Sequence, residues 1–97
     1  MNLEITEVEK EVISQALDLY SRLLCGQYEE LSTMYRYGKL VPINKVNERS
    51  SQLVDAHVFG LKHVLFPELS DHASYSIISD QAPEKAKIAY DIYNRLK

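Results

Sequence analysis

The sequence has little of what builds special scaffolds: one cysteine, three glycines, three prolines, no tryptophan and no long apolar run. A single cysteine, Cys25, can form neither an intrachain disulfide nor a cysteine-based zinc site. The absence of disulfides is typical of proteins from a reducing compartment. The few glycines and prolines exclude collagen-like and low-complexity chains. No segment approaches the roughly 18 apolar residues of a membrane span. No basic segment followed by an apolar one marks a signal peptide, so we expect a cytoplasmic location and no membrane association.

The charge balance and the length narrow the class of protein further. Eleven basic residues against fourteen acidic ones give a net charge of −3. A dedicated nucleic-acid binder needs a basic face, so we expect no nucleic-acid partner. With 97 residues, 45% of them hydrophobic, the chain has the length and composition of one folded domain spanning residues 1–97.

The residue patterns of known catalytic and metal sites are missing. The three glycines are scattered, so there is no phosphate-binding loop. His57 and His63 are six residues apart on a predicted helix and face different ways, whereas a helical metal site needs a spacing of four. Ser70, Asp71 and His72 have the residue types of a catalytic triad without a spacing that specifies its geometry. We therefore expect a protein that is not an enzyme, with no catalytic residues, metal ligands or cofactor.

The first half of the chain predicts one long helix. Thr6 and Glu9 have the spacing of a capping box, which marks a helix start. From Val8 to Tyr35 apolar residues recur every three or four positions, as one helical face requires. We predict an unbroken helix over residues 7–37, about 45 Å long, that ends at Gly38. A helix of this length either carries the whole fold or extends into a partner subunit.

Two residues inside this predicted helix indicate contact with another helix. Gly26 lowers helix stability by up to about 1 kcal/mol relative to alanine, and its most direct benefit is close approach of another backbone. Gln27 falls in the middle of the apolar face, where a buried amide must find hydrogen-bond partners. It is either a polar group that fixes the register of a helix pair or a ligand contact.

Two further helices complete the expected fold. A second helix of about 20 residues is predicted to start at the cap residue Asn44 and to end at Phe66–Pro67. Its apolar face includes His57, and Phe59 lies on the far side as part of a second packing surface. Residues 68–81 form a polar loop without a predicted strand. A third helix of about 14 residues begins at Pro83, with Ile88 and Tyr90 off its apolar face.

These patterns predict an all-α fold with a long N-terminal helix, a second helix antiparallel to it and a shorter C-terminal helix. Several apolar residues fall outside the faces that one copy can bury. We therefore expect a homo-oligomer, most simply a dimer, with Gly26, Gln27, Phe59 and Ile88 at the interface.

The chain is unusually rich in tyrosine, with seven against two phenylalanines. Tyrosine is enriched where a protein meets another molecule. The loop at Ser74, Tyr75 and Ser76 offers backbone N–H groups, two hydroxyls and an aromatic ring. Tyr90 is free of the core face, and the guanidinium of Arg95 can grip a phosphate through two hydrogen bonds. We predict a ligand site here, with the alternative that Tyr75 fills the core and Arg95 frays with the chain end.

Three segments resemble a family of small, largely uncharacterised helical proteins encoded by phages and prophages. They read LDLYSRLLCGQYEE over residues 17–30, ASY over residues 73–75, and PEKAKIAYDIYNRL over residues 83–96. The resemblance implies a phage protein that acts in the cytoplasm of a bacterial host. It supplies no catalytic residues.

Two classes of binding function fit that context. The first is a counter-defence sponge that sequesters a small signalling nucleotide made by the host, with tyrosines stacking on bases and arginine holding phosphates. The second is a protein–protein inhibitor that blocks a host or defence enzyme with its tyrosine-rich faces. A phage accessory protein of another role is a third reading. The sequence alone slightly favours the nucleotide sponge.

Overall fold

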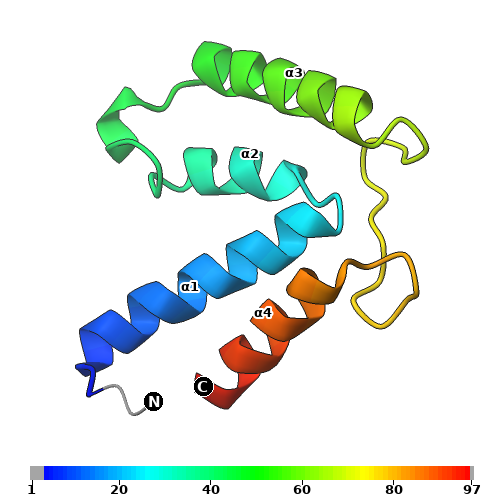
Figure 1. The fold of residues 1–97 in the computed structure, drawn as a ribbon. Coiled ribbons are helices and arrows are strands. Elements are labelled where there is room, and N and C mark those ends of the chain that lie inside the picture. The colour runs from blue at the N-terminus through cyan, green and yellow to red at the C-terminus, as the bar shows by residue number, and fades with distance from the viewer. Residues whose placement is uncertain (1–3, 97) are drawn as a thin grey trace. The chain divides into compact units, whose positions relative to one another are not determined.

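The computed structural model describes residues 4–96, and this part of the chain is all-helical, as predicted. It contains four α-helices, with no strand in the described range (Figure 1). The helices are α1 (Glu7–Leu24), α2 (Glu29–Arg36), α3 (Glu48–Leu65) and α4 (Glu84–Leu96), and a short 3₁₀ helix, η1 (Ile43–Lys45), precedes α3. None of these helices is long and apolar enough to cross a membrane.

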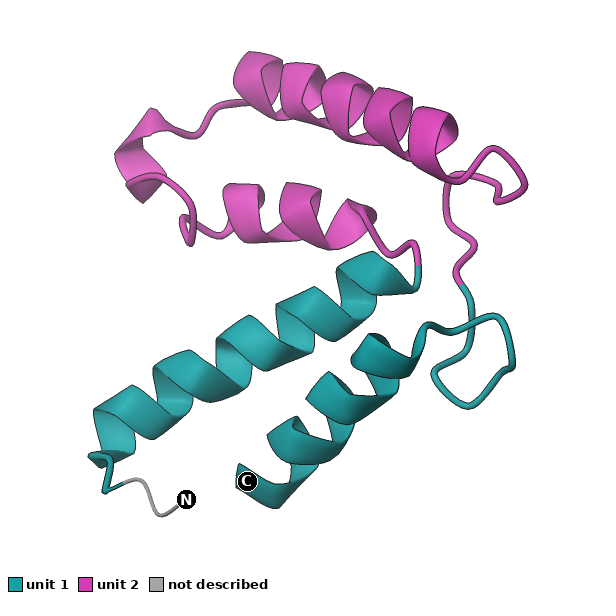
Figure 2. Ribbon diagram, in the orientation of Figure 1, with its two compact units in different colours: residues 1–25, 75–97 teal, residues 26–74 magenta. Residues whose placement is uncertain are grey.

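The chain, predicted to be a single domain over residues 1–97, forms two compact units. Unit 1 combines the two ends of the chain, residues 1–25 and 75–97, and contains α1 and α4 (Figure 2). Unit 2 is the middle of the chain, residues 26–74, and contains α2, η1 and α3. Within unit 1, α1 and α4 pack side by side and run in opposite directions, as do α2 and α3 within unit 2.

The predicted unbroken helix over residues 7–37 is wrong, because the chain breaks between α1 and α2. The capping box at Thr6 and Glu9 starts α1 as expected. Gly26, however, has a φ of +87°, which is the left-handed conformation that ends many helices and that glycine adopts without strain. The apolar spacing keeps its phase across this four-residue break. Periodicity alone could therefore not reveal the break.

The core of unit 1 is built from small side chains around Cys25. The sequence places Cys25 on the polar face of a helix, but in the structure it caps α1 and is buried with Ala82 and Ala86. Tyr75 packs against this cluster, and its backbone N–H donates to the carbonyl oxygen of Cys25 at 2.9 Å. The end of α1 and the segment before α4 are thus joined by both packing and a backbone hydrogen bond.

The start of α3 lies three residues later than predicted, at Asn47 instead of Asn44. The Asn47 side chain accepts from the backbone N–H of Ser50, and the Ser50 hydroxyl accepts from the backbone N–H of Asn47. Asn44 lies in η1. The predicted end at Phe66–Pro67 is confirmed, and so is the start of the last helix next to Pro83.

The buried face of α3 is rotated from the predicted one. Leu53, His57 and Leu61, which the apolar pattern places in the core, are exposed, whereas Val54 and Val58 of the same pattern are half-buried. The inner face also takes in Phe59 from the predicted far side, which packs against His72 with 5.5 Å between ring centroids, and Lys62, which is completely buried. The reason is that the segment after α3 folds back over this face and covers it.

Candidate functional site

The residues predicted to bind a ligand are only partly brought together. Ser74 belongs to unit 2, where its hydroxyl accepts a hydrogen bond from the Gln27 amide at 3.2 Å. Tyr75 belongs to unit 1 and is half-buried against the Cys25 cluster, so it takes the core-filling role that was the alternative. Ser76 is exposed in the same loop.

Tyr90 and Arg95 lie on α4, four and nine residues beyond the turn of Ala86. Ala86 of α4 packs in the cluster that also holds Tyr75. Arg95 is nine residues beyond Ala86, which at 1.5 Å per residue is roughly 13 Å along the helix. The Arg95 guanidinium also pairs with Asp91 at 3.2 Å, and Tyr90 lies near Tyr93 with 6.3 Å between ring centroids. The guanidinium and the Ser76 loop thus lie toward opposite ends of α4.

Three of the four predicted interface residues make contacts inside unit 2. Gly26 is buried beside Phe66 and Leu69, and Phe59 packs on His72. Gln27 is half-buried, not buried as predicted, and donates to Ser74. Ile88 on α4 is 50% exposed and remains available to a partner.

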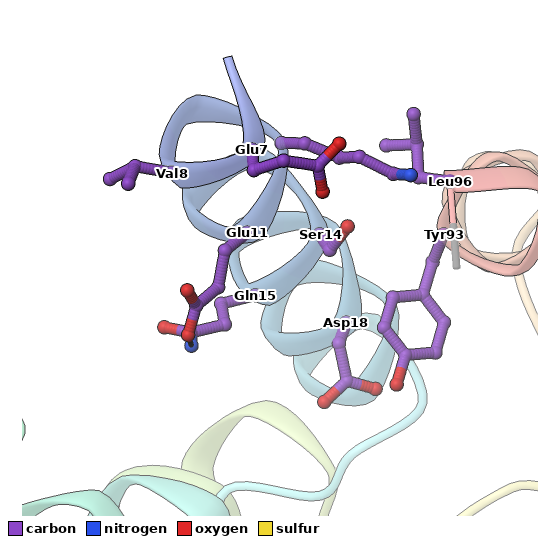
Figure 3. A pocket seen from close by; sticks show the side chains of 9 residues that line it. Glu7, Val8, Glu11, Ser14, Gln15, Asp18, Tyr93 and Leu96 are labelled. Carbon is purple, nitrogen blue, oxygen red and sulfur yellow. Dashed lines mark hydrogen bonds between the residues drawn. The ribbon is translucent and has the colours of Figure 1, made fainter.

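Unit 1 has an open groove of about 520 Å³ between α1 and α4. Seven residues of α1 line it: Glu7, Val8, Lys10, Glu11, Ser14, Gln15 and Asp18. Tyr93 and Leu96 close it from α4 (Figure 3). We refer to this feature as the α1–α4 groove.

The spacing of these residues explains why they form one face. Glu7, Glu11, Ser14 and Asp18 are separated by four, three and four positions, so their side chains line up along one side of α1. The last turns of α4 lie beside this side because the two helices run in opposite directions (Figure 1). The groove therefore depends on the pairing of the two ends of the chain.

The α1–α4 groove is lined by both acidic and apolar side chains. Its carboxylates, Glu7, Glu11 and Asp18, outnumber its one ammonium, Lys10. Asp18 pairs with Arg22 at 3.1 Å, and Glu11 accepts a hydrogen bond from the Gln15 amide at 3.3 Å. Such a groove suits a cationic group on an apolar stem, because carboxylates attract the charge and an aromatic face accepts both stem and cation. It does not suit a polyanion.

Sequence reasoning missed this groove although part of its signal was visible. From the sequence, no role was assigned to Glu11 or Asp18. The spacing of the three carboxylates along one side of α1 could have been noticed. Their proximity to Tyr93, 75 residues after Asp18, could not, because only the tertiary structure brings α4 to α1.

Unit 2 is organised around a completely buried lysine. The Lys62 ammonium donates three hydrogen bonds: to the Glu29 carboxylate at 3.2 Å and to the backbone carbonyls of Asp71 and Ala73 at 2.8 and 2.6 Å. His63 pairs with the Asp71 carboxylate at 2.6 Å on the surface. Lys62 uses all its donors in holding the segment after α3 against α2 and α3, so its role is structural.

Neither Cys25 nor a cluster of metal ligands marks a reactive centre among the described residues. Burial of the Cys25 thiol raises its pKa, and the nearby Lys87 ammonium opposes this only in part. A raised pKa keeps the sulfur as the unreactive thiol. Among residues 4–96, no group of three or more histidine, cysteine, aspartate or glutamate side chains is placed to hold a metal ion.

Comparisons with protein-family models, with curated proteins and with solved structures found no match to this chain.

Proposed function

We propose that this protein is a non-enzymatic protein-binding module whose α1–α4 groove takes a basic, partly apolar segment of a partner protein. The observation that carries the proposal is the composition of the groove: apart from Asp18, which pairs with Arg22, the carboxylates of Glu7 and Glu11 face one ammonium, and Tyr93 and Leu96 add apolar surface from α4. A lysine or arginine from a partner can place its alkyl stem on Tyr93 and its charge near Glu7 and Glu11.

The exposed apolar residues of α1 support a protein partner over a small molecule. Val8, which lines the groove, is 70% exposed, and Val12, one turn further, is 61% exposed. Ala16 and Tyr20 continue the same exposed row at intervals of four. A contiguous apolar row beside a charged groove is typical of surfaces that bind another protein.

In the phage context implied by the sequence resemblance, the proposed role is inhibition. The module would bind a basic surface of a host or defence enzyme in the bacterial cytoplasm and block it by occupying that surface. A blocker needs no chemistry of its own, only a stable contact with its target.

The nucleotide sponge ranks second. The exposed ring of Tyr90 beside Tyr93 offers a place for a base to stack. The one arginine expected to hold a phosphate, Arg95, however, pairs with Asp91. The groove itself repels anions.

The test is a binding titration with two designed helical peptides of equal length and apolar content, one carrying lysines and one carrying glutamates. We expect the basic peptide to bind and the acidic one not to bind. Raising the ionic strength from about 0.01 M to about 1 M shortens the Debye length from about 30 Å to about 3 Å and should weaken binding strongly. Equal binding of both peptides, or none, would contradict the proposal.

A matched pair of double variants locates the site. Glu7→Gln with Glu11→Gln removes two charges from the groove, and Asp80→Asn with Glu84→Gln removes two exposed charges of unit 1 outside it. Two exposed ion pairs together contribute about 1.4 kcal/mol, so we expect the first variant to lose about tenfold in affinity and the second to lose little.

A parallel titration with cyclic and linear nucleotides decides the second reading. Binding tighter than roughly 10 μM that is lost in Tyr90→Ala and Arg95→Ala would put the sponge first. Absence of nucleotide binding together with binding of the basic peptide supports the protein-binding module.

A further inference from the structure

The outer face of α3 in unit 2 is a largely apolar surface on which His63 pairs with Asp71 of the following segment. The exposed residues of the helix between positions 52 and 65 include no aspartate, glutamate, lysine or arginine. They are Gln52, Leu53, Ala56, His57, Gly60, Leu61, His63, Val64 and Leu65. Depletion of charge within an exposed patch is the compositional mark of the core of a protein–protein interface. We refer to this surface as the outer face of α3.

The large side chains on this face are fully available to a partner. Leu53 is 53% exposed, Leu61 is 47% exposed and Val64 is 76% exposed. In the described part of the chain, the hydrophobic residues that are buried are all small: Cys25, Ala82, Ala86 and Ala89. The chain by itself therefore leaves unburied the apolar area that normally stabilises a domain of this size.

Gly60 gives this face a place where a second helix can approach closely. It lies in the interior of α3, where glycine is less favourable than alanine by up to about 1 kcal/mol. A Cβ atom added at Gly60 would meet nothing within 4 Å, so no contact inside the chain requires the missing side chain. A partner helix packed on the outer face would use it.

We propose that two copies of this chain pair through the outer faces of their α3 helices, in antiparallel orientation. A two-fold axis between His57 and Gly60 places Leu53 of one copy opposite Val64 of the other. The same register places the His57 imidazole over Gly60 of the second copy, where the absent side chain leaves room for the ring. Large residues thus meet smaller ones along the whole contact.

Charges at the ends of α3 identify the occupant as a second copy. Arg49 lies in the first turn of α3, and Glu68 follows three residues after its end; both are exposed. In the antiparallel register, Arg49 of each copy lies opposite Glu68 of the other, so the dimer gains two symmetric ion pairs. An isologous interface requires such self-complementarity. The uncharged centre of this face and the opposite charges at its two ends provide this self-complementarity. Without such pairing, the net charge of −3 on each chain would favour repulsion between two copies.

This interface is independent of the α1–α4 groove, which is formed by other residues in unit 1. Loss of dimerisation and loss of peptide binding can therefore be measured separately, and either proposal can fail without the other.

The first experiment is sedimentation analysis of the full chain from about 1 μM to 1 mM. A single helix pair is at the small end of specific interfaces, so we expect a monomer–dimer equilibrium in the micromolar range. Leu61→Glu should leave a monomer at all these concentrations, because it buries a carboxylate in the centre of the contact. The control is Ile78→Glu, at a residue outside α3 that is 87% exposed; it should dimerise like the parent.

The second experiment tests the register by exchanging charges. Arg49→Glu and Glu68→Arg each place like charges opposite one another twice per dimer, so each should weaken dimerisation about tenfold. The double variant Arg49→Glu with Glu68→Arg restores both pairs and should recover the parent affinity. A mixture of the two single variants should form a heterodimer more stable than either homodimer.

The outcomes separate the possibilities clearly. Recovery in the double variant and preferential heterodimer formation support the antiparallel contact. A parent chain that stays monomeric up to about 1 mM overturns the proposal, and so does a dimer that Leu61→Glu leaves intact. If Leu61→Glu abolished the dimer but neither Arg49→Glu nor Glu68→Arg changed its affinity, the proposed antiparallel register would be wrong. Circular dichroism of each variant, compared with the parent, distinguishes a dissociated dimer from an unfolded chain.

Discussion

At the scale of single residues, unit 2 depends on a charge in its interior. Lys62 is completely buried, and each of its three donors has an oxygen partner. A buried ammonium is tolerated only when its hydrogen bonds are complete, because the loss of hydration must be compensated. Two of the acceptors are backbone carbonyls of Asp71 and Ala73, so this side chain also fixes the path of the chain after α3.

Lys62→Met is expected to destabilise the protein by about 3 kcal/mol. Methionine fills similar space but leaves the Glu29 carboxylate and two carbonyls without their donor, and breaking a buried ion pair typically costs this much. Urea denaturation followed by circular dichroism measures the loss. Lys85→Met, at an exposed lysine of α4, is the control and should change the free energy of unfolding little. A loss below about 1 kcal/mol for Lys62→Met would show that these hydrogen bonds contribute little.

Gly26→Ala should destabilise the chain by about 1–2 kcal/mol or more even as a monomer. The φ of +87° is unfavourable for alanine, and its Cβ would lie 2.6 Å from Cδ1 of Leu69. Gly60→Ala is the matched control, because its helical backbone and open surroundings accept a methyl group. In dilute solution Gly60→Ala should stabilise the monomer by about 0.5–1 kcal/mol. If Gly26→Ala were as stable as the parent, the left-handed turn between α1 and α2 would be wrong.

At the scale of the elements, α3 has one face that packs inside unit 2 and one exposed apolar face that we propose to pair with a second copy. Its inner face carries Phe59 and Lys62, which hold the segment after the helix. Its outer face carries Leu53, Leu61 and Val64. A helix with functional residues on both faces depends on a well-defined start, because a shift of one residue rotates every side chain by about 100°.

Asn47→Ala is expected to cost about 1 kcal/mol of stability, whereas Asn44→Ala is expected to cost almost nothing. Asn47 exchanges two hydrogen bonds with Ser50 in the capping box, and Asn44 makes no cap contact. Thermal unfolding of the two variants side by side is the measurement. A larger effect at Asn44 would restore the helix start that the sequence pattern indicated.

At the scale of the whole molecule, the chain consists of two helix pairs, and the sequence of the second pair lies between the two helices of the first. Unit 1 is made from the two ends of the chain, and unit 2 is the segment between them (Figure 2). Each unit closes its own ends: Tyr75 bonds to Cys25 in unit 1, and Gln27 bonds to Ser74 in unit 2. Within unit 2, the connection from Tyr37 to Asn47 is exposed at most positions and contains only the short η1.

Limited trypsin digestion should therefore cut first after Lys39 or Lys45, in the connection between α2 and α3. Both lysines are exposed in a segment with little regular structure, which a protease can bind without unfolding a helix. Cleavage after Lys62 should follow only when unit 2 unfolds, since this lysine is buried. Mass spectrometry of early fragments gives the order, and an early cut after Lys62 would contradict the structure of unit 2.

The sequence by itself determined the helical character of the chain and most helix ends. Thr6 with Glu9, Gly38, Pro67 and Pro83 act through their own backbone preferences and near neighbours, so their effects are visible in a local pattern. The same local reasoning failed at Gly26, because a glycine can occupy a helix or break it, and the spacing of apolar residues fits both.

Only the tertiary structure decided which faces of the helices are buried and where a site forms. The apolar row on α3 predicts a buried face, yet the segment held by Lys62 covers a neighbouring face that shares only Val54 and Val58 with it, and this depends on contacts with Asp71 and Ala73 that no periodicity encodes. The α1–α4 groove likewise needs Tyr93 beside Asp18, from opposite ends of the chain. The amphipathic pattern indicates which side of a helix can be buried. Long-range packing determines which segment covers the helix, and an apolar face that no segment covers stays exposed.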